Sequence, residues 1–176
     1  MRHIVIAFLM VLSLASSSVV ATEPAPLESL AFLLGEWEST GSGQPGSGTG
    51  TAVFSRGLQD RVILRKSYAD YPPAGGKPGY RHDDLMVIHA DAGGAVRADY
   101  YDSEGHVIRY TVELPAANQA VFLGEATANA PRFRLTYKLE GDGSMTGEFA
   151  MAPPGSSDDF KPYLHWTSHK AGDGAK

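Results

Sequence analysis

Residues 132–139 have the sequence RFRLTYKL, in which polar and apolar side chains alternate along the whole stretch. Residues 106–113, with the sequence HVIRYTVE, can be divided in the same way into two alternating sets. Successive side chains of a β-strand point to opposite faces, so this pattern is typical of a strand with one face in water and one face packed. The two stretches therefore predict a sheet whose strands are each half-buried.

Eight further segments of similar length and character surround these two. The links between the segments are short and rich in turn residues, for example DAGG at 91–94 and EGDG at 140–143. Such links are too short for a crossover, so sequential strands should pair as antiparallel hairpins. About ten strands are expected, at 36–42, 49–56, 61–69, 83–89, 95–101, 106–113, 119–126, 132–139, 145–151 and 163–169.

Ten sequential strands with free edges would invite association between chains, and closure of the sheet removes those edges. We therefore expect an all-β fold, an up-and-down antiparallel β-barrel of about ten strands, with a β-sandwich as the alternative. A barrel of this strand number is wide enough that side chains need not fill it. The expected consequence is a ligand cavity in the lumen.

A short N-terminal helix is expected before the first strand. Leu27, Leu30 and Leu34 recur at helical spacing, and Gly35 ends the pattern. Trp37 follows directly, where a large aromatic side chain can plug the closed end of a barrel.

Residues 1–21 have the features of a secretory signal peptide. Arg2 precedes a short apolar run, and small residues follow up to Ala21. The apolar run is shorter than the roughly 20 residues of a membrane-spanning helix, and no later segment could span a bilayer. We expect a signal peptide at 1–21, a tether at 22–26, one barrel domain at 27–170 and a flexible tail at 171–176, in a protein that is secreted, most plausibly to the periplasm.

Composition restricts the function further. The formal net charge is −5 and there is no basic run, which argues against nucleic-acid binding, because release of counterions from phosphates requires clustered Lys and Arg. The chain has no cysteine, which excludes disulfides, thiolate nucleophiles and thiolate metal sites. The expected partner is a small molecule, and the sequence leaves the oligomeric state open.

Two stretches carry a resemblance to a known family. Residues 32–37, FLLGEW, followed by Gly41 and Gly43, resemble the opening of the nitrobindin-like, lipocalin-like (calycin) β-barrels, and residues 162–167, PYLHWT, resemble their last strand. Residues 101–110 and 131–137 resemble a group of secreted bacterial barrels specifically. The resemblance implies a ten-stranded barrel with a ligand cup. It also implies a haem site, because the histidine that holds haem iron in nitrobindin falls on His165.

Alternation opposes the haem assignment. Leu164 and Trp166 are the apolar members of their strand, so burying them turns His165 outward. The resemblance places His165 inside and the pattern places it outside. Other metal donors gather at 82–91, but His82 and Asp84 share one face while Asp83 and His89 share the other, so no three of them converge locally.

Aromatic residues at expected inward positions are the candidate ligand contacts. Arg134 joins them as a possible anchor for an acidic ligand, although its place among polar neighbours equally fits a solvated outer face. The candidate ligand-binding set is Trp37, Tyr100, Tyr110, Arg134, Tyr137, Phe149 and Trp166.

The favoured function is non-catalytic binding of a small amphipathic or hydrophobic ligand in the lumen, with no cofactor. The alternatives are a haem protein that uses His165, and a small hydrolase or isomerase in the barrel mouth. No catalytic motif is recognisable, and Asp102, Glu104 and His106 occupy a tight turn in which solvated side chains are the default. An enzyme would instead require histidine–carboxylate pairs inside the cup.

Overall fold

All ten predicted strands form in a computed structural model that describes residues 26–43, 47–156 and 158–172. The predicted leader lies outside these residues, as do most of the predicted tether and tail, so those assignments stay predictions. The strands are β1 (Gly35–Gly43), β2 (Gly48–Gly57), β3 (Val62–Tyr71), β4 (Tyr80–Ala90), β5 (Val96–Asp102), β6 (Val107–Ala116), β7 (Gln119–Gly124), β8 (Arg132–Leu139), β9 (Met145–Ala152) and β10 (Lys161–Lys170).

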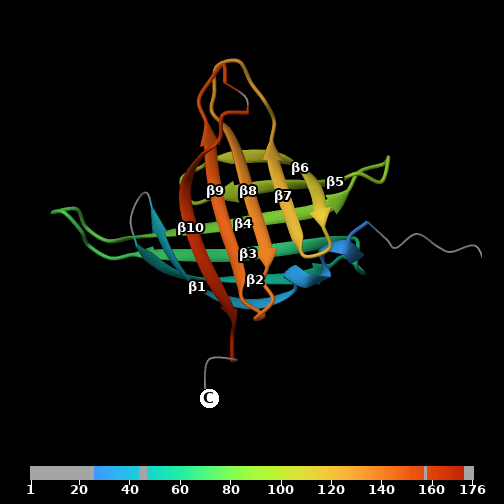
Figure 1. The fold of residues 1–176 in the computed structure, drawn as a ribbon, viewed down its shortest axis with the longest axis horizontal. Coiled ribbons are helices and arrows are strands. Elements are labelled where there is room, and N and C mark those ends of the chain that lie inside the picture. Colours follow the sequence, from blue (N-terminus) through green and yellow to red (C-terminus); the bar gives the residue numbers. More distant parts are fainter. Residues whose placement is uncertain (1–25, 44–46, 157, 173–176) are drawn as a thin grey trace, which may run out of the picture.

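Each strand pairs antiparallel with the next along the chain, and β1 pairs with β10 to close a ten-stranded barrel. At this seam Thr40 lies opposite Thr167, and the hydroxyls of Ser39 and Ser168 are 2.7 Å apart. Figure 1 shows β7 to β10 crossing in front of β2 to β5, so that the two groups of strands form opposite walls. The predicted closed barrel is confirmed, and the sandwich alternative is wrong.

One end of the barrel is closed by the predicted helix, which forms as a short 3-10 helix, η1 (Glu28–Leu33). Leu30 and Leu33 of η1 are fully buried. Trp37 is also fully buried, and its Nε1 donates a hydrogen bond to the carbonyl of Leu33 at 2.8 Å. Gly35 joins helix and strand at a φ of +121°, which glycine adopts more readily than other residues.

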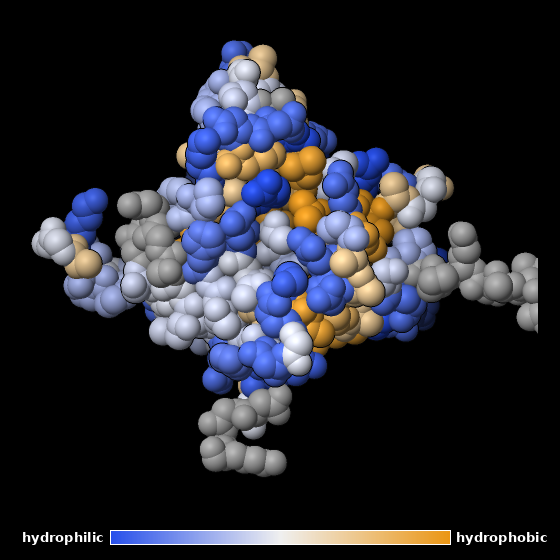
Figure 2. Space-filling view, viewed as in Figure 1, coloured by the Kyte–Doolittle hydropathy of each residue, from blue (hydrophilic) through white to orange (hydrophobic). Residues whose placement is uncertain are grey.

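The apolar core fills this closed end. Its fully buried members come from inward positions of strands all round the barrel: Trp37, Ile63, Met86, Ile88, Ala120 and Phe122. On the face shown in Figure 2, apolar areas are interrupted by polar residues. Within the described residues, no helix has the length and apolar character needed to cross a membrane.

Candidate ligand-binding cavity

Beyond the core, the other half of the lumen holds a cavity of about 560 Å³. Its walls come from inward positions of β1 to β6 and of β8 to β10. Side chains at its outer end, such as Tyr80 and Tyr163, are partly exposed, so this end forms the mouth. The volume lies within the usual range for pockets that bind small organic molecules, about 300–1,000 Å³.

Five predicted ligand contacts lie together in this cavity, and they are Tyr100, Tyr110, Tyr137, Phe149 and Trp166. The apolar residues Ile108, Phe133, Leu135 and Leu164 also line the cavity. A β-bulge between Pro162 and Leu164 shifts the register of β10, and Tyr163 and Leu164 both line the cavity. Trp37 does not line it, because Trp37 lies in the core at the closed end.

A buried ion pair lies on the opposite, polar wall. Arg65 of β3 donates a hydrogen bond of 2.5 Å from Nη2 to Asp84 of β4, and both side chains are 7% exposed. Nη1 of Arg65 donates to the hydroxyl of Tyr137, and Ser67 donates to the second oxygen of Asp84 at 2.7 Å. Burial is the largest single effect and by itself would lower the pKa of Arg65, but the charge of Asp84, its hydrogen bond and the neighbouring Tyr137 and Tyr100 together outweigh burial, so the pKa is raised and the guanidinium stays charged.

Burial has the opposite outcome for the more enclosed tyrosines of the cavity, which it keeps uncharged. Burial raises the pKa of Tyr100, Tyr110 and Tyr137 above the ordinary value of a phenol, and the charge of Asp84 adds to the effect. Burial and the neighbouring Tyr80 raise the pKa of Tyr71 to about 12. The cavity thus presents phenol hydroxyls as hydrogen-bond donors and acceptors, not phenolates.

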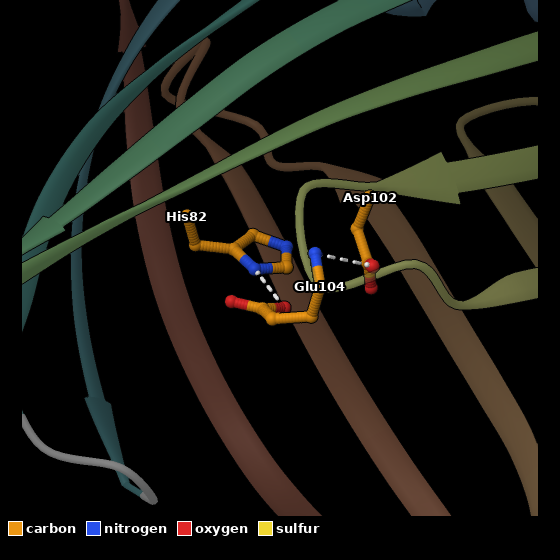
Figure 3. Close-up of side chains that lie close together, drawn as sticks. All are labelled: His82, Asp102 and Glu104. Carbon is orange, nitrogen blue, oxygen red and sulfur yellow. Dashed lines mark hydrogen bonds and ion pairs between the residues drawn. The ribbon is translucent and has the colours of Figure 1, made fainter.

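Two histidine–carboxylate pairs lie at the mouth. His82 of β4 has its Nδ1 2.7 Å from Glu104, which belongs to the β5–β6 turn, as Figure 3 shows. His106 has its Nδ1 2.9 Å from Asp102, the last residue of β5. Burial would raise the pKa of Asp102, but hydrogen bonds from His106 and from the backbone of Glu104 hold it below the ordinary value.

The turn predicted at 102–106 forms, and two of its side chains are solvated as expected: Glu104 is 43% exposed and His106 is 69% exposed, whereas the side chain of Asp102, at 4%, is buried. Asp102, Glu104 and His106 also line the cavity, because β5 ends and β6 begins at its rim. His82 and Asp84 share an inward face, as alternation predicts. The donors that converge on His82 come from the next hairpin along the chain, a contact that local spacing does not reveal.

Arg65 is among the cavity residues that the sequence analysis did not identify. In the stretch VILRK at 62–66, apolar residues occupy both faces, so alternation does not tell which face Arg65 takes. Ile63, Arg65 and Ser67 occupy alternate positions and therefore share one face of the strand. The polar pair Arg65 and Ser67 on that face is the sequence feature that could have indicated a polar site.

The prediction that Arg134 contacts a ligand in the lumen is wrong. It points out from β8, where Nη2 lies 3.0 Å from Glu148 and the guanidinium stacks over the ring of Phe160. The physical reason is alternation, because its neighbours Phe133 and Leu135 take the inward positions.

His165 also lies on the outer wall. Its side chain is 53% exposed and its Nδ1 is 3.8 Å from Glu148. In this conformation its imidazole cannot ligate an iron inside the lumen, so the residue implied by the resemblance does not fit an internal haem. Alternation, with Leu164 and Trp166 facing the cavity, predicts this orientation correctly.

Fold and site together define a closed, ten-stranded antiparallel β-barrel with an internal cavity of mixed polarity. No family model and no curated protein matches the sequence, so the nitrobindin-like resemblance stays a prediction. Among solved structures, the chain is similar to a de novo designed fluorescence-activating β-barrel. The two share 10% sequence identity at a TM-score of 0.37, over 79% of this chain and 94% of the designed one.

Proposed function

We propose that the protein binds a small amphipathic molecule in the lumen of its barrel without transforming it. The observation that carries the proposal is the cavity of about 560 Å³ with two unlike walls. The apolar wall, which includes Phe149 and Trp166, supplies contact area for a hydrophobic body. The polar wall around Arg65 and Tyr100 supplies hydrogen bonds that orient a polar head, the usual division of roles in small-molecule sites.

The proposal is tested by titrating the purified protein with a dansyl-labelled undecanoic acid and with retinol, followed by probe fluorescence. The matched variants are Ile108→Trp, which fills the cavity, and Val107→Trp, which adds the same ring to the 59% exposed outer position next to it. We expect saturable binding that Ile108→Trp reduces at least about tenfold, a loss of 1.4 kcal/mol, and that Val107→Trp leaves intact. Absence of saturation with both probes, or equal effects of both variants, would contradict the proposal.

A second candidate, acid–base catalysis at the mouth, is favoured by the two imidazole–carboxylate pairs of His82 and His106. These are the groups that an enzyme in this position requires. A panel of chromogenic esters would test it, with hydrolysis expected to fall in His82→Gln and not in His89→Gln, whose imidazole lies on the outer face of the same strand. Hydrolysis no faster than in buffer would count against this candidate.

A further inference from the structure

Three potential metal-ligating side chains converge at the cavity mouth from two parts of the barrel. His82 comes from β4, while Asp102 and Glu104 come from the end of β5 and the turn after it, as Figure 3 shows. One ligand atom from each lies within 4.8 Å of the others. Ligand atoms that share one tetrahedral zinc ion lie roughly 3.3 Å apart, given bond lengths of about 2.0–2.2 Å. Small side-chain movements therefore suffice to bring all three onto one ion.

Hydrogen bonds orient two of the three donors, His82 and Asp102. His82 presents Nδ1 to the set, and its Nε2 lies 3.0 Å from the hydroxyl of Tyr100. Asp102 accepts backbone hydrogen bonds at Oδ1 from Glu104 and His106, at 3.0 and 2.8 Å. Metal-ligating histidines commonly engage their other ring nitrogen in this way, which fixes the tautomer and the ring direction.

The charges at the mouth favour a cation. Arg65 is already neutralised by Asp84. In the described part of the chain, the ion-pair partners of Asp102 and Glu104 are the histidines His106 and His82, and neither carboxylate pairs with Lys or Arg. Two carboxylates of the same turn thus lie close together at the mouth without a permanently positive Lys or Arg side chain paired to either.

We propose that His82, Asp102 and Glu104 bind a divalent transition-metal ion at the mouth of the cavity. One imidazole nitrogen with two carboxylates favours Zn²⁺ and its first-row neighbours, since Mg²⁺ and Ca²⁺ prefer oxygen donors throughout. Three protein ligands leave coordination positions open for water or a ligand atom. Because all three residues line the cavity, the ion would border the space proposed for the amphipathic ligand. The metal site does not depend on that ligand being bound.

Calorimetric titration of the purified, chelator-treated protein with ZnCl₂ tests the site. We expect one ion per chain, with affinity lowered at least about hundredfold by His82→Ala or Glu104→Gln. Tyr100→Phe, which removes the hydroxyl that contacts Nε2 of His82 and donates to Asp102 at 3.4 Å, should lower it about tenfold, in the range known for such supporting residues. Titration with Co²⁺ should give a visible absorption spectrum that His82→Ala removes.

The matched control is His89→Ala, which removes an imidazole from the outer face of the same strand and should leave affinity unchanged. Far-UV circular dichroism of each variant separates lost binding from lost folding, and Glu104→Gln changes a turn residue outside the strands. No zinc binding at 100-fold excess, or binding that survives both His82→Ala and Glu104→Gln, overturns the proposal. So does a site that His106→Ala removes and His82→Ala does not.

Discussion

Arg65 is the residue on which the polar half of the lumen is built. Its guanidinium connects Asp84 on the neighbouring strand with Tyr137 on the opposite wall. Replacing it by methionine leaves the carboxylate of Asp84 buried without its cation. We expect Arg65→Met to lower the free energy of unfolding by about 3–5 kcal/mol, measured by urea denaturation, because breaking one half of a buried pair strands the other charge.

The double variant Arg65→Met with Asp84→Leu is the control for this prediction. It removes both charges at once, so most of the lost stability should return. If the double variant is as unstable as the single one, the loss reflects packing and not the unpaired charge.

At the residue scale, sequence reasoning worked where a strand alternates cleanly and failed where it does not. Phe149 and Trp166 were placed correctly in the cavity because Phe149 alternates in phase with Met145 and Met151, and Trp166 in phase with Leu164. Arg65 was missed because the stretch around it is apolar on both faces. The approach of Glu104 to His82 depends on how one hairpin folds over the next strand, and no local pattern encodes it.

Among the elements, η1 has a role out of proportion to its six residues. It closes one end of the barrel with Leu30 and Leu33, both fully buried. We expect Leu30→Ala to lower the free energy of unfolding by about 2–5 kcal/mol, because it removes buried methyl groups and leaves a cavity. Urea denaturation would measure the change.

The matched control for the η1 prediction is Leu58→Ala. Leu58 lies in the β2–β3 turn and is 75% exposed. Its replacement should change stability by no more than about 0.5 kcal/mol. A similar loss in both variants would show that η1 is not the stabilising plug.

Strand β9 passes directly beneath the indole of Trp166, and Gly147 makes this approach possible. A Cβ atom at Gly147 would lie 2.0 Å from Trp166. We therefore expect Gly147→Ala to displace the indole, shifting tryptophan fluorescence and lowering stability by about 1–3 kcal/mol, as overpacking does.

Gly141→Ala is the comparison for this strand, because Gly141 lies in the preceding turn with open space where a Cβ would stand. It should leave the fluorescence spectrum unchanged. An unshifted spectrum in Gly147→Ala would mean that the indole is not packed against this glycine.

For the molecule as a whole, the buried tyrosines predict how the barrel responds to alkali. The pKa of Tyr71 is raised to about 12, and the pKa values of Tyr100, Tyr110 and Tyr137 are also raised. A phenol whose folded pKa exceeds its unfolded value of about 10 contributes stability that is constant below pH 10 and falls as the pH rises through the folded pKa. Stability should therefore decline above about pH 10.

Absorbance at 295 nm, recorded together with circular dichroism, checks this expectation. Part of the eight tyrosines should ionise in a step that coincides with loss of the β-sheet signal, and Tyr137→Phe should reduce the size of that step. A single smooth titration of all tyrosines with the sheet signal intact would contradict it.

The architecture was more predictable than the site. Short turn-rich links force sequential strands to pair, and a sheet of ten such strands removes its free edges by closing, so the barrel follows from local rules. The hydrogen bond from Arg65 to Tyr137 and the contact of His82 with Glu104 each join residues far apart in the sequence, and their proximity is a property of the closed barrel. Contacts between side chains of distant strands can be predicted only when the pairing register of the strands is known.

The plug formed by η1 and Trp37 closes one end of the lumen, so the cavity opens at the mouth. A ligand held there would have to leave through the mouth by which it entered, and a second ligand could not displace it from the closed end. The rate at which one ligand replaces another would then equal the dissociation rate of the first ligand, whatever the concentration of the second. Under the proposed function, a bound ligand would therefore be retained until it dissociates by itself through the mouth.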